Sequence, residues 1–182
     1  MIMTVSELRQ FIQSDESDIV LEAKLQALEL LIRAYTNNNF MVRAFRAVAV
    51  SVADHSLVTT GAIPFRSGDT LQITESDFQQ DMLVTVESVS DGTIIVSEDL
   101  IDESGIVITK IKYPPDVKMG CVNLMKWELD NREKVGVQSE SISRHSVTYF
   151  NMDAGNSTMG FPASLLGFLK PYKKARFGGG IK

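Results

Sequence analysis

Residues 113–132 read Y-P-P-D-V-K-M-G-C-V-N-L-M-K-W-E-L-D-N-R. The two prolines stop any regular element before them, and Asp116 is placed to cap the first free N–H groups of a helix. At 100° per residue the apolar positions of this stretch share one arc, with polar residues opposite. Those positions are Val117, Cys121, Val122, Leu124, Met125 and Leu129. The stretch therefore predicts a helix over residues 116–132 that buries one side.

The residues that follow this helix change character. Gly136 is a typical helix end, residues 138–146 predict a polar, serine-rich loop, and residues 147–150 read as a strand. Ser143 and Ser146 flank His145, which raises the alternative of a small Ser/His hydrolase. The chain has no G-x-S-x-G turn, and a nucleophile and its base usually come from distant segments. The residues therefore argue against the hydrolase.

The N-terminal residues predict two helices. Thr4 and Glu7 form a capping-box pattern, and a short helix is expected to end near Ser14. The acidic residues Asp15, Glu16 and Asp18 then suit the start of a longer helix, which ends at residues 37–39. Its apolar side chains recur every three or four residues: Leu21, Leu25, Leu28, Leu31, Ile32 and Tyr35. We expect this stripe to pack against the helix over residues 116–132.

Between the helical parts, from residue 40, the hydrophobic period changes to that of strands. Alternation places Val48, Val50 and Val52 on one face of the first strand, with Ala47 and Ala49 on the other. Further strands are expected over residues 57–60, 71–74, 82–89, 93–97 and 106–113, and Ser90-Asp91-Gly92 predicts a hairpin turn. This pattern predicts a small antiparallel β-barrel or sandwich.

The C-terminal residues predict a last helix and a tail. The helix starts at Pro162 and stops before Pro171. The tail is basic and aromatic, and a peptide that docks on a partner explains it better than a frayed terminus. The predicted docking residues are Pro171, Tyr172, Lys173, Lys174, Arg176 and Phe177.

The predicted fold is therefore α+β. A small bundle of three to four helices carries the inserted barrel or sandwich and an extended C-terminal tail. The expected parts are the N-terminal helices (1–39), the β-rich insertion (40–113), the C-terminal helices and serine-rich loop (114–170) and the docking tail (171–182).

The charge distribution bears on nucleic-acid binding. Residues 1–113 carry 8 Lys+Arg and 17 Asp+Glu, whereas residues 114–182 carry 10 and 6. A nucleic-acid binder needs a basic footprint, and an oligonucleotide-binding barrel needs aromatic and basic residues interleaved. The acidic first part argues against both. It suits a channel through which DNA slides without sticking, although solvated acidic loops explain it equally well.

We predict neither metal nor cofactor. Calcium binding is a minor option, because the acids Asp69, Asp77, Asp81 and Asp91 lack the spacing of a calcium loop. A zinc site from His55, His145 and Cys121 has no support in the spacing, and Cys121 is expected to be a buried thiol. We expect no secretory signal and no membrane-spanning segment.

Residues 126–153, K-W-E-L-D-N-R-E-K-V-G-V-Q-S-E-S-I-S-R-H-S-V-T-Y-F-N-M-D, precede a second run, G-F-P-A-S-L-L-G-F-L-K-P-Y-K-K-A-R-F, over residues 160–177. Together they resemble the head–tail connector proteins, also called head-completion or adaptor proteins, of long-tailed phages and prophages of Gram-positive bacteria. The likeness is close over residues 114–177 and looser elsewhere.

The resemblance implies a structural protein of the virion neck with no enzymatic activity. It implies a dodecameric ring seated on the portal, with a stopper or other tail-side protein below it and DNA passing through the lumen. It places assembly in the host cytoplasm. Another neck or tail-side component, such as a stopper or tail terminator, is the alternative.

The resemblance and the composition together suggest which residues make the contacts. The serine-rich loop is expected to contact a neighbouring protomer or the portal, with Arg144 as a charged anchor. The residues assigned to this contact are Ser139, Ser141, Ser143, Arg144, Ser146 and Tyr149.

Overall fold

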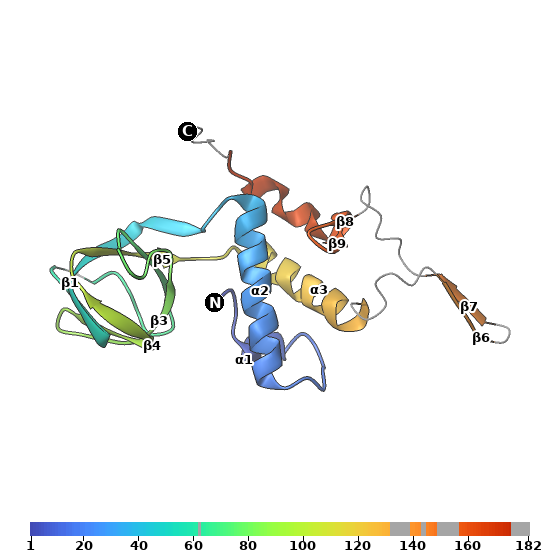
Figure 1. Cartoon of the computed structure of the whole chain (residues 1–182), viewed down its shortest axis with the longest axis horizontal. Coiled ribbons are helices and arrows are strands. Elements are labelled where there is room, and N and C mark those ends of the chain that lie inside the picture. The colour runs from blue at the N-terminus through green and yellow to red at the C-terminus, as the bar shows by residue number, and fades with distance from the viewer. Residues whose placement is uncertain (62, 132–138, 143–144, 149–156, 176–182) are drawn as a thin grey trace. The chain divides into compact units, whose positions relative to one another are not determined.

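The computed structural model describes residues 1–61, 63–131, 139–142, 145–148 and 157–175. The chain divides into two compact units (Figure 1). The barrel unit comprises Met1 and Asn39–Tyr113, and the helical unit comprises Ile2–Asn38 and Pro114–Lys182. The predicted α+β class is confirmed.

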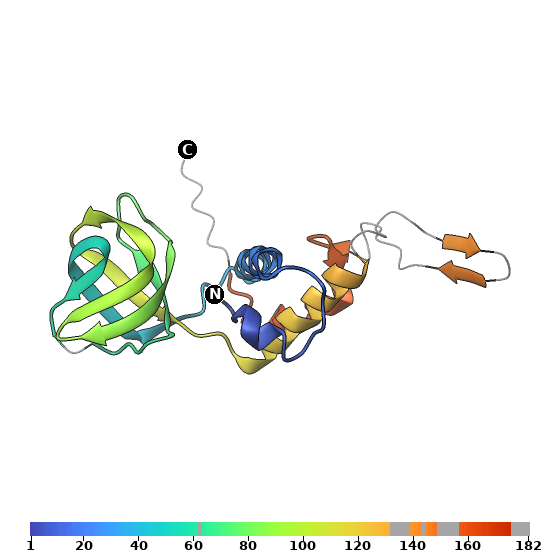
Figure 2. The same cartoon turned by 90° about the horizontal axis from the view of Figure 1, so that it is seen from below.

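The barrel unit is a closed antiparallel barrel with the strand order β1-β4-β3-β2-β5, so the barrel and not the sandwich is present (Figure 2). The strands are β1 (Met41–Thr59), β2 (Thr70–Thr74), β3 (Leu83–Ser90), β4 (Thr93–Glu103) and β5 (Ile106–Ile111). The first part of β1 pairs with β5 and its last part pairs with β4. One long strand thereby closes the barrel.

Two strands are longer than the alternation predicts. β1 continues through residues 53–56, and β4 extends beyond residue 97 to Glu103. The pairing of β1 with β4 shifts register on both sides of Asp54, which has a positive φ of 52°. Such bulges interrupt the alternation without ending the strand. The predicted Ser90-Asp91-Gly92 hairpin is confirmed, because Ser90 pairs with Thr93 across a two-residue turn.

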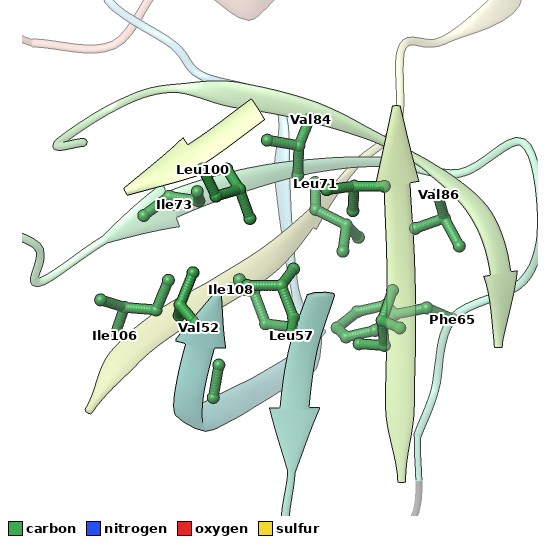
Figure 3. Close-up of a cluster of buried hydrophobic side chains, with 13 residues drawn as sticks. Val52, Leu57, Phe65, Leu71, Ile73, Val84, Val86, Leu100, Ile106 and Ile108 are labelled. Carbon is green, nitrogen blue, oxygen red and sulfur yellow. The ribbon is translucent and has the colours of Figure 1, made fainter. Parts of the chain in front are cut away.

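The barrel interior is filled with aliphatic side chains and Phe65 (Figure 3). The predicted common face of Val48, Val50 and Val52 is wrong: Val48 and Val50 are exposed, whereas Ala49 and Val52 are buried. The reason is that β1 changes partner there, with Ala49 opposite Ile106 on β5 and Val52 opposite Glu103 on β4. The buried members of this core are Ala49, Val52, Leu57, Phe65, Leu71, Ile73, Val84, Val86, Ile94, Val96, Leu100, Ile106 and Ile108.

The helical unit contains α1 (Val5–Leu8), α2 (Asp18–Thr36), α3 (Pro115–Asn131) and the 3₁₀ helix η2 (Ala163–Tyr172). α2 packs against α3, and α3 packs against η2. The pairing expected between the two long helices is therefore present. The predicted bundle has three to four helices. Within the described residues, the long α-helices form one packed pair, because α1 has only four residues and η2 is a 3₁₀ helix.

The apolar arcs of α2 and α3 are buried largely as their periodicity predicts. The buried residues include Leu21, Leu25, Leu28 and Ile32 of α2, and Val117, Cys121, Val122, Leu124 and Met125 of α3. Tyr35, Leu31 and Leu129 are half-buried at the edges. Asp116 lies in the first turn of α3, where its carboxylate accepts a hydrogen bond of 3.0 Å from the Val117 N–H, so its predicted capping of a free N–H group is confirmed.

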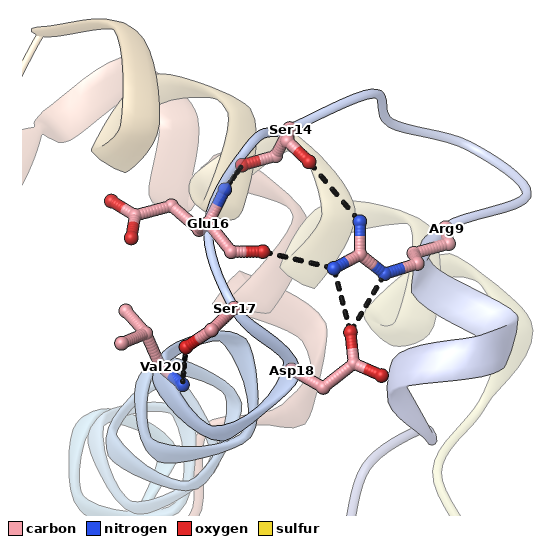
Figure 4. A network of polar contacts seen from close by, with 6 residues as sticks. All are labelled: Arg9, Ser14, Glu16, Ser17, Asp18 and Val20. Atoms are coloured by element: carbon pink, nitrogen blue, oxygen red, sulfur yellow. Dashed lines mark hydrogen bonds and ion pairs between the residues drawn. The ribbon is translucent and has the colours of Figure 1, made fainter.

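Polar contacts fix the connection between α1 and α2. The predicted capping box of Thr4 and Glu7 is confirmed. Beyond α1, the Arg9 guanidinium donates to Oδ1 of Asp18 at 2.6 and 2.9 Å and to the carbonyls of Ser14 and Glu16 (Figure 4). Ser17 caps α2 by accepting a hydrogen bond from the Val20 N–H. One cation thus ties the loop to the first turn of α2, where Asp18 also suits the helix dipole.

The described residues also form two short pairs of antiparallel strands. They are β6 (Ser139–Ile142) with β7 (His145–Thr148), and β8 (Ser157–Thr158) with β9 (Phe161–Pro162). Among the described helices, none combines the length and apolarity needed to span a membrane.

Candidate functional site: the C-terminal segment

The serine-rich stretch does not form the predicted irregular loop at residues 139–142. These residues form β6, which pairs with β7, with Ser139 opposite Thr148 and Ser141 opposite Ser146. A strand was expected only from residue 147, because serine and glutamate are weak strand signals. Ser143, Arg144 and Tyr149 lie outside the described residues. The assignment of this stretch to a portal or protomer contact stays a prediction.

The C-terminal segment begins inside a helix. η2 includes Pro171 and Tyr172, so the expectation that the helix stops before Pro171 is wrong. That expectation used the clash of a proline ring with the carbonyl four residues earlier, which belongs to α-helical geometry. η2 is a 3₁₀ helix and ends one residue after the proline.

Tyr172 connects this segment to the start of α3. Its hydroxyl donates to the Asp116 carboxylate, with both oxygens 2.8 Å away. Its carbonyl accepts a hydrogen bond of 3.2 Å from the side-chain amide of Asn38. The hydrogen bond to Asp116 raises the pKa of the Tyr172 hydroxyl, and burial and the Asp116 charge raise it further. The side chain is thereby held as the neutral donor.

The next three residues lie along the C-terminal end of α2. The Lys174 N–H donates to the Thr36 carbonyl at 2.8 Å, satisfying one of the carbonyls that a helix end leaves unpaired. Asn37 adopts the left-handed conformation that ends α2, and its side-chain amide donates to the Ala175 carbonyl at 3.0 Å. The Lys173 ammonium lies 3.7 Å from the centre of the Tyr35 ring, in a cation–π contact.

These contacts anchor residues 172–175 to their own chain while leaving lysine side chains in solvent. Lys170, Lys173 and Lys174 are exposed. Residues 157–175 contain these three lysines and no Asp or Glu. Together with Lys170, the anchored segment therefore forms a fixed basic surface. Arg176 and Phe177, also predicted to dock, lie outside the described residues.

Replacing Tyr172 by phenylalanine is expected to lower the midpoint of thermal unfolding of the helical unit at pH 7, because the Asp116 carboxylate loses its hydroxyl donor. The raised pKa means that the folded state holds this proton more tightly than the unfolded state. The contribution is therefore complete below pH 10 and is lost as the pH rises through the raised value. Circular dichroism melts of both proteins between pH 7 and 11 measure this; an equal difference at every pH would contradict it.

A second group of polar side chains lies on the barrel and was missed by sequence reasoning. Nε2 of His55 is 3.1 Å from Asp99 and 3.7 Å from Asp54, and Nδ1 is 3.1 Å from the Glu98 carbonyl. The three side chains could each offer one ligand atom to a cation. Both carboxylates are well exposed, and an ion pair with a protonated His55 accounts for the same geometry. The adjacent pair Asp54-His55 was the available signal, but Asp99 joins it only through the β1–β4 pairing.

Cys121 is the buried core thiol that the sequence predicts. Burial raises its pKa to about 12, and the negative charge of Glu29 adds to the shift. Only the thiolate binds zinc or attacks electrophiles. In this environment Cys121 is held as the neutral, buried thiol.

We expect Cys121 to resist a disulfide reagent at pH 8 in the folded protein. The shift from an ordinary 9.0 to about 12 lowers the thiolate fraction on the order of a thousandfold. Absorbance of the released thiol, followed with and without 6 M guanidinium, measures the ratio of rates. Comparable rates in the two conditions would contradict the burial of this thiol.

Comparisons with known proteins assign no family. No family model matches the chain, and no curated protein matches it. Among solved structures, the Gp54 tailspike of Acinetobacter baumannii bacteriophage AP22 matches at 20% identity and a TM-score of 0.30, covering 40% of this chain and 14% of that one. The tailspike gp49 of Pseudomonas phage LKA1 matches at 20% identity and a TM-score of 0.27, covering 35% and 14%. Likenesses this low carry no argument about the present chain.

Proposed function

We propose that this chain is a structural protein of a phage neck that forms a ring on the portal and connects the DNA-filled head to the tail. The observation that carries the proposal is the resemblance of residues 126–153 and 160–177 to head–tail connector proteins. Runs of this length are far more specific than a short motif.

The fixed basic surface supports the proposal, because it offers a preformed contact. A segment already ordered on its own chain loses less conformational entropy on docking than a free tail does. Lys170, Lys173 and Lys174 are exposed along this surface. In the proposed complex they face acidic side chains of the portal or of a neighbouring protomer.

The proposed ring needs no covalent chemistry. Identical protomers in head-to-tail contact close into a ring when the rotation per subunit divides a full turn. Apolar area buried between protomers, at about 25 cal/mol per Å², would supply most of the association energy. The acidic character of residues 1–113, with 17 Asp+Glu against 8 Lys+Arg, favours a lumen to which DNA does not adhere.

The test is to mix the purified protein with the portal and image the mixture by electron microscopy. We expect a ring of additional density on the portal. Because residues 172–175 are held by α2 and α3, the informative truncation removes residues 176–182 and retains this anchor. Loss of portal binding in this truncation, with an unchanged melting temperature, would assign docking to those last residues. A protein that binds no portal would overturn the proposal.

Simple measurements distinguish the proposed function from two alternative functions. A stopper or tail terminator would co-purify with tail-tube components and not with the portal. A Ser/His hydrolase would lose turnover of ester substrates in a His145→Ala variant, whereas a connector with this substitution would still assemble.

A further inference from the structure

The turn after β2 carries an exposed aromatic side chain in a rigid setting. Phe78 is 68% exposed, and Ile101 of β4 is 55% exposed. Gln79, next to Phe78, is buried and links the turn to Ile101: its side-chain amide donates to the Ile101 carbonyl and accepts from the Ile101 N–H, both at 3.0 Å. Phe78 and Ile101 together are called the knob below.

Glu103 holds the other side of the same turn. Its carboxylate accepts hydrogen bonds from the Ser76 hydroxyl at 2.6 Å, from the Asp77 N–H at 2.7 Å and from Gln79 at 3.5 Å. These bonds favour the charged form, and the bond from Ser76 contributes most to lowering the pKa of Glu103. The turn keeps this support at neutral pH and loses it as the pH falls through the lowered value, below 4.5.

The hydrogen bonds of Gln79 and Glu103 thus hold the turn in a conformation that leaves the apolar Phe78 side chain exposed to solvent. An anchor held in place before binding avoids part of the entropic cost of association, and aromatic anchors dominate many protein interfaces. This arrangement is the one expected for a contact residue.

The surroundings of the knob are acidic. Asp77 and Asp102 are its sequence neighbours, and both are exposed. The barrel unit carries 11 Asp+Glu and 5 Lys+Arg. The surface that receives the knob should therefore be apolar with a basic border.

The helical unit offers such a surface on α2. Ile19, Ala23, Ala27, Leu30 and Ala34 are exposed and share one face of the helix, with Ile19 80% and Leu30 64% exposed. The C-terminal end of α2 holds Lys174, through its backbone bond to Thr36, and Lys173, which lies over Tyr35. An apolar helix face thus ends beside two exposed lysines.

We propose that the knob of one copy packs on the C-terminal part of α2 of a second copy, at Leu30 and Ala34, with Asp77 and Asp102 facing Lys173 and Lys174. The inference rests on the proposed function and names the protomer contact of its ring. The two surfaces are unlike, so the contact is head-to-tail and adds further copies in one direction.

The position of the knob on the barrel favours a second copy as the occupant. The chain enters and leaves the barrel beside Met41 and Ile111, which pair with each other. The turn that carries Phe78 follows the other end of β2, where Thr74 pairs with Val107. The knob therefore lies at the barrel end from which no connection to the helical unit leaves.

The experiment is sedimentation velocity on the full chain over a range of concentrations, in 50 and 500 mM salt. We expect concentration-dependent association that weakens in high salt. Phe78→Ala should weaken it about thirtyfold, as expected for an anchor residue. Phe11→Ala is the matched control, because Phe11 is also exposed and lies in the helical unit away from both surfaces in sequence.

A charge exchange tests the pairing itself. Asp77→Lys and Lys174→Glu should each weaken association, and the double variant should regain most of it. Both substitutions leave the structural bonds in place, because Asp77 and Lys174 take part in these through their backbone N–H groups.

The outcomes separate this inference from the proposed function. A wild-type chain that stays monomeric but decorates the portal would overturn the inference and leave the connector role standing. Association unaffected by Phe78→Ala, or a double variant no better than the single ones, would also overturn the inference.

Discussion

An Ile108→Ala variant is expected to lower the free energy of unfolding of the barrel by about 3 kcal/mol, since buried Ile→Ala changes typically cost 2–5 kcal/mol. Ile108 is fully buried in the centre of β5. It pairs with Ala47 of β1 on one side and with Ile73 of β2 on the other. Because strands hold it on both sides, the cavity left by the truncation cannot collapse easily.

Ile101→Ala is the matched control for this change, because it removes the same atoms from an exposed position of the same barrel. It should cost less than about 1 kcal/mol. Urea titrations of both variants and the wild type, followed by far-ultraviolet circular dichroism, give the two free-energy differences. Equal costs for the two variants would show that the Ile108 side chain is not buried in the barrel core.

The strand periodicity predicted most of the barrel, and its failures have a local cause. The turn at Asp91-Gly92 was predictable because its two residues suit the positive φ values of 43° and 85°. The inward face of β1 was not predictable, because the alternation rule assumes that a strand keeps one pairing partner and one register. The pairing partner of β1 changes from β5 to β4 between Ala49 and Val52, and this change of partner is a property of the closed barrel.

The candidate sites were harder to predict from the sequence than the fold. The basic and aromatic composition of residues 171–177 marked the C-terminal segment, but its bonds to Thr36, Asn37 and Asn38 join residues more than 130 positions apart. The knob gave no sequence signal at all. Phe78 reads as an ordinary apolar residue in an acidic loop, and only the burial of Gln79 and the bonds to Glu103 show that it is held outward.

Gly120 of α3 is expected to resist even the smallest side chain. A Cβ atom at this position would lie inside contact distance of the Phe168 ring of η2. Gly→Ala in a helix normally stabilises by about 1 kcal/mol. Here we expect a net loss of about 1–2 kcal/mol, because the new methyl group displaces the ring from the buried glycine and overpacking is costly.

The same substitution should change sign when the ring is removed. A Phe168→Ala background removes the three atoms nearest to the new methyl group, so Gly120→Ala should there stabilise by up to about 1 kcal/mol through helix propensity. The four proteins form a double-mutant cycle, measured by urea unfolding, with an expected coupling of about 2–3 kcal/mol. A coupling near zero would mean that η2 does not pack on α3 at Gly120. A large coupling would show that the C-terminal segment, with its lysines, is held on the helical unit by this close approach of ring and backbone.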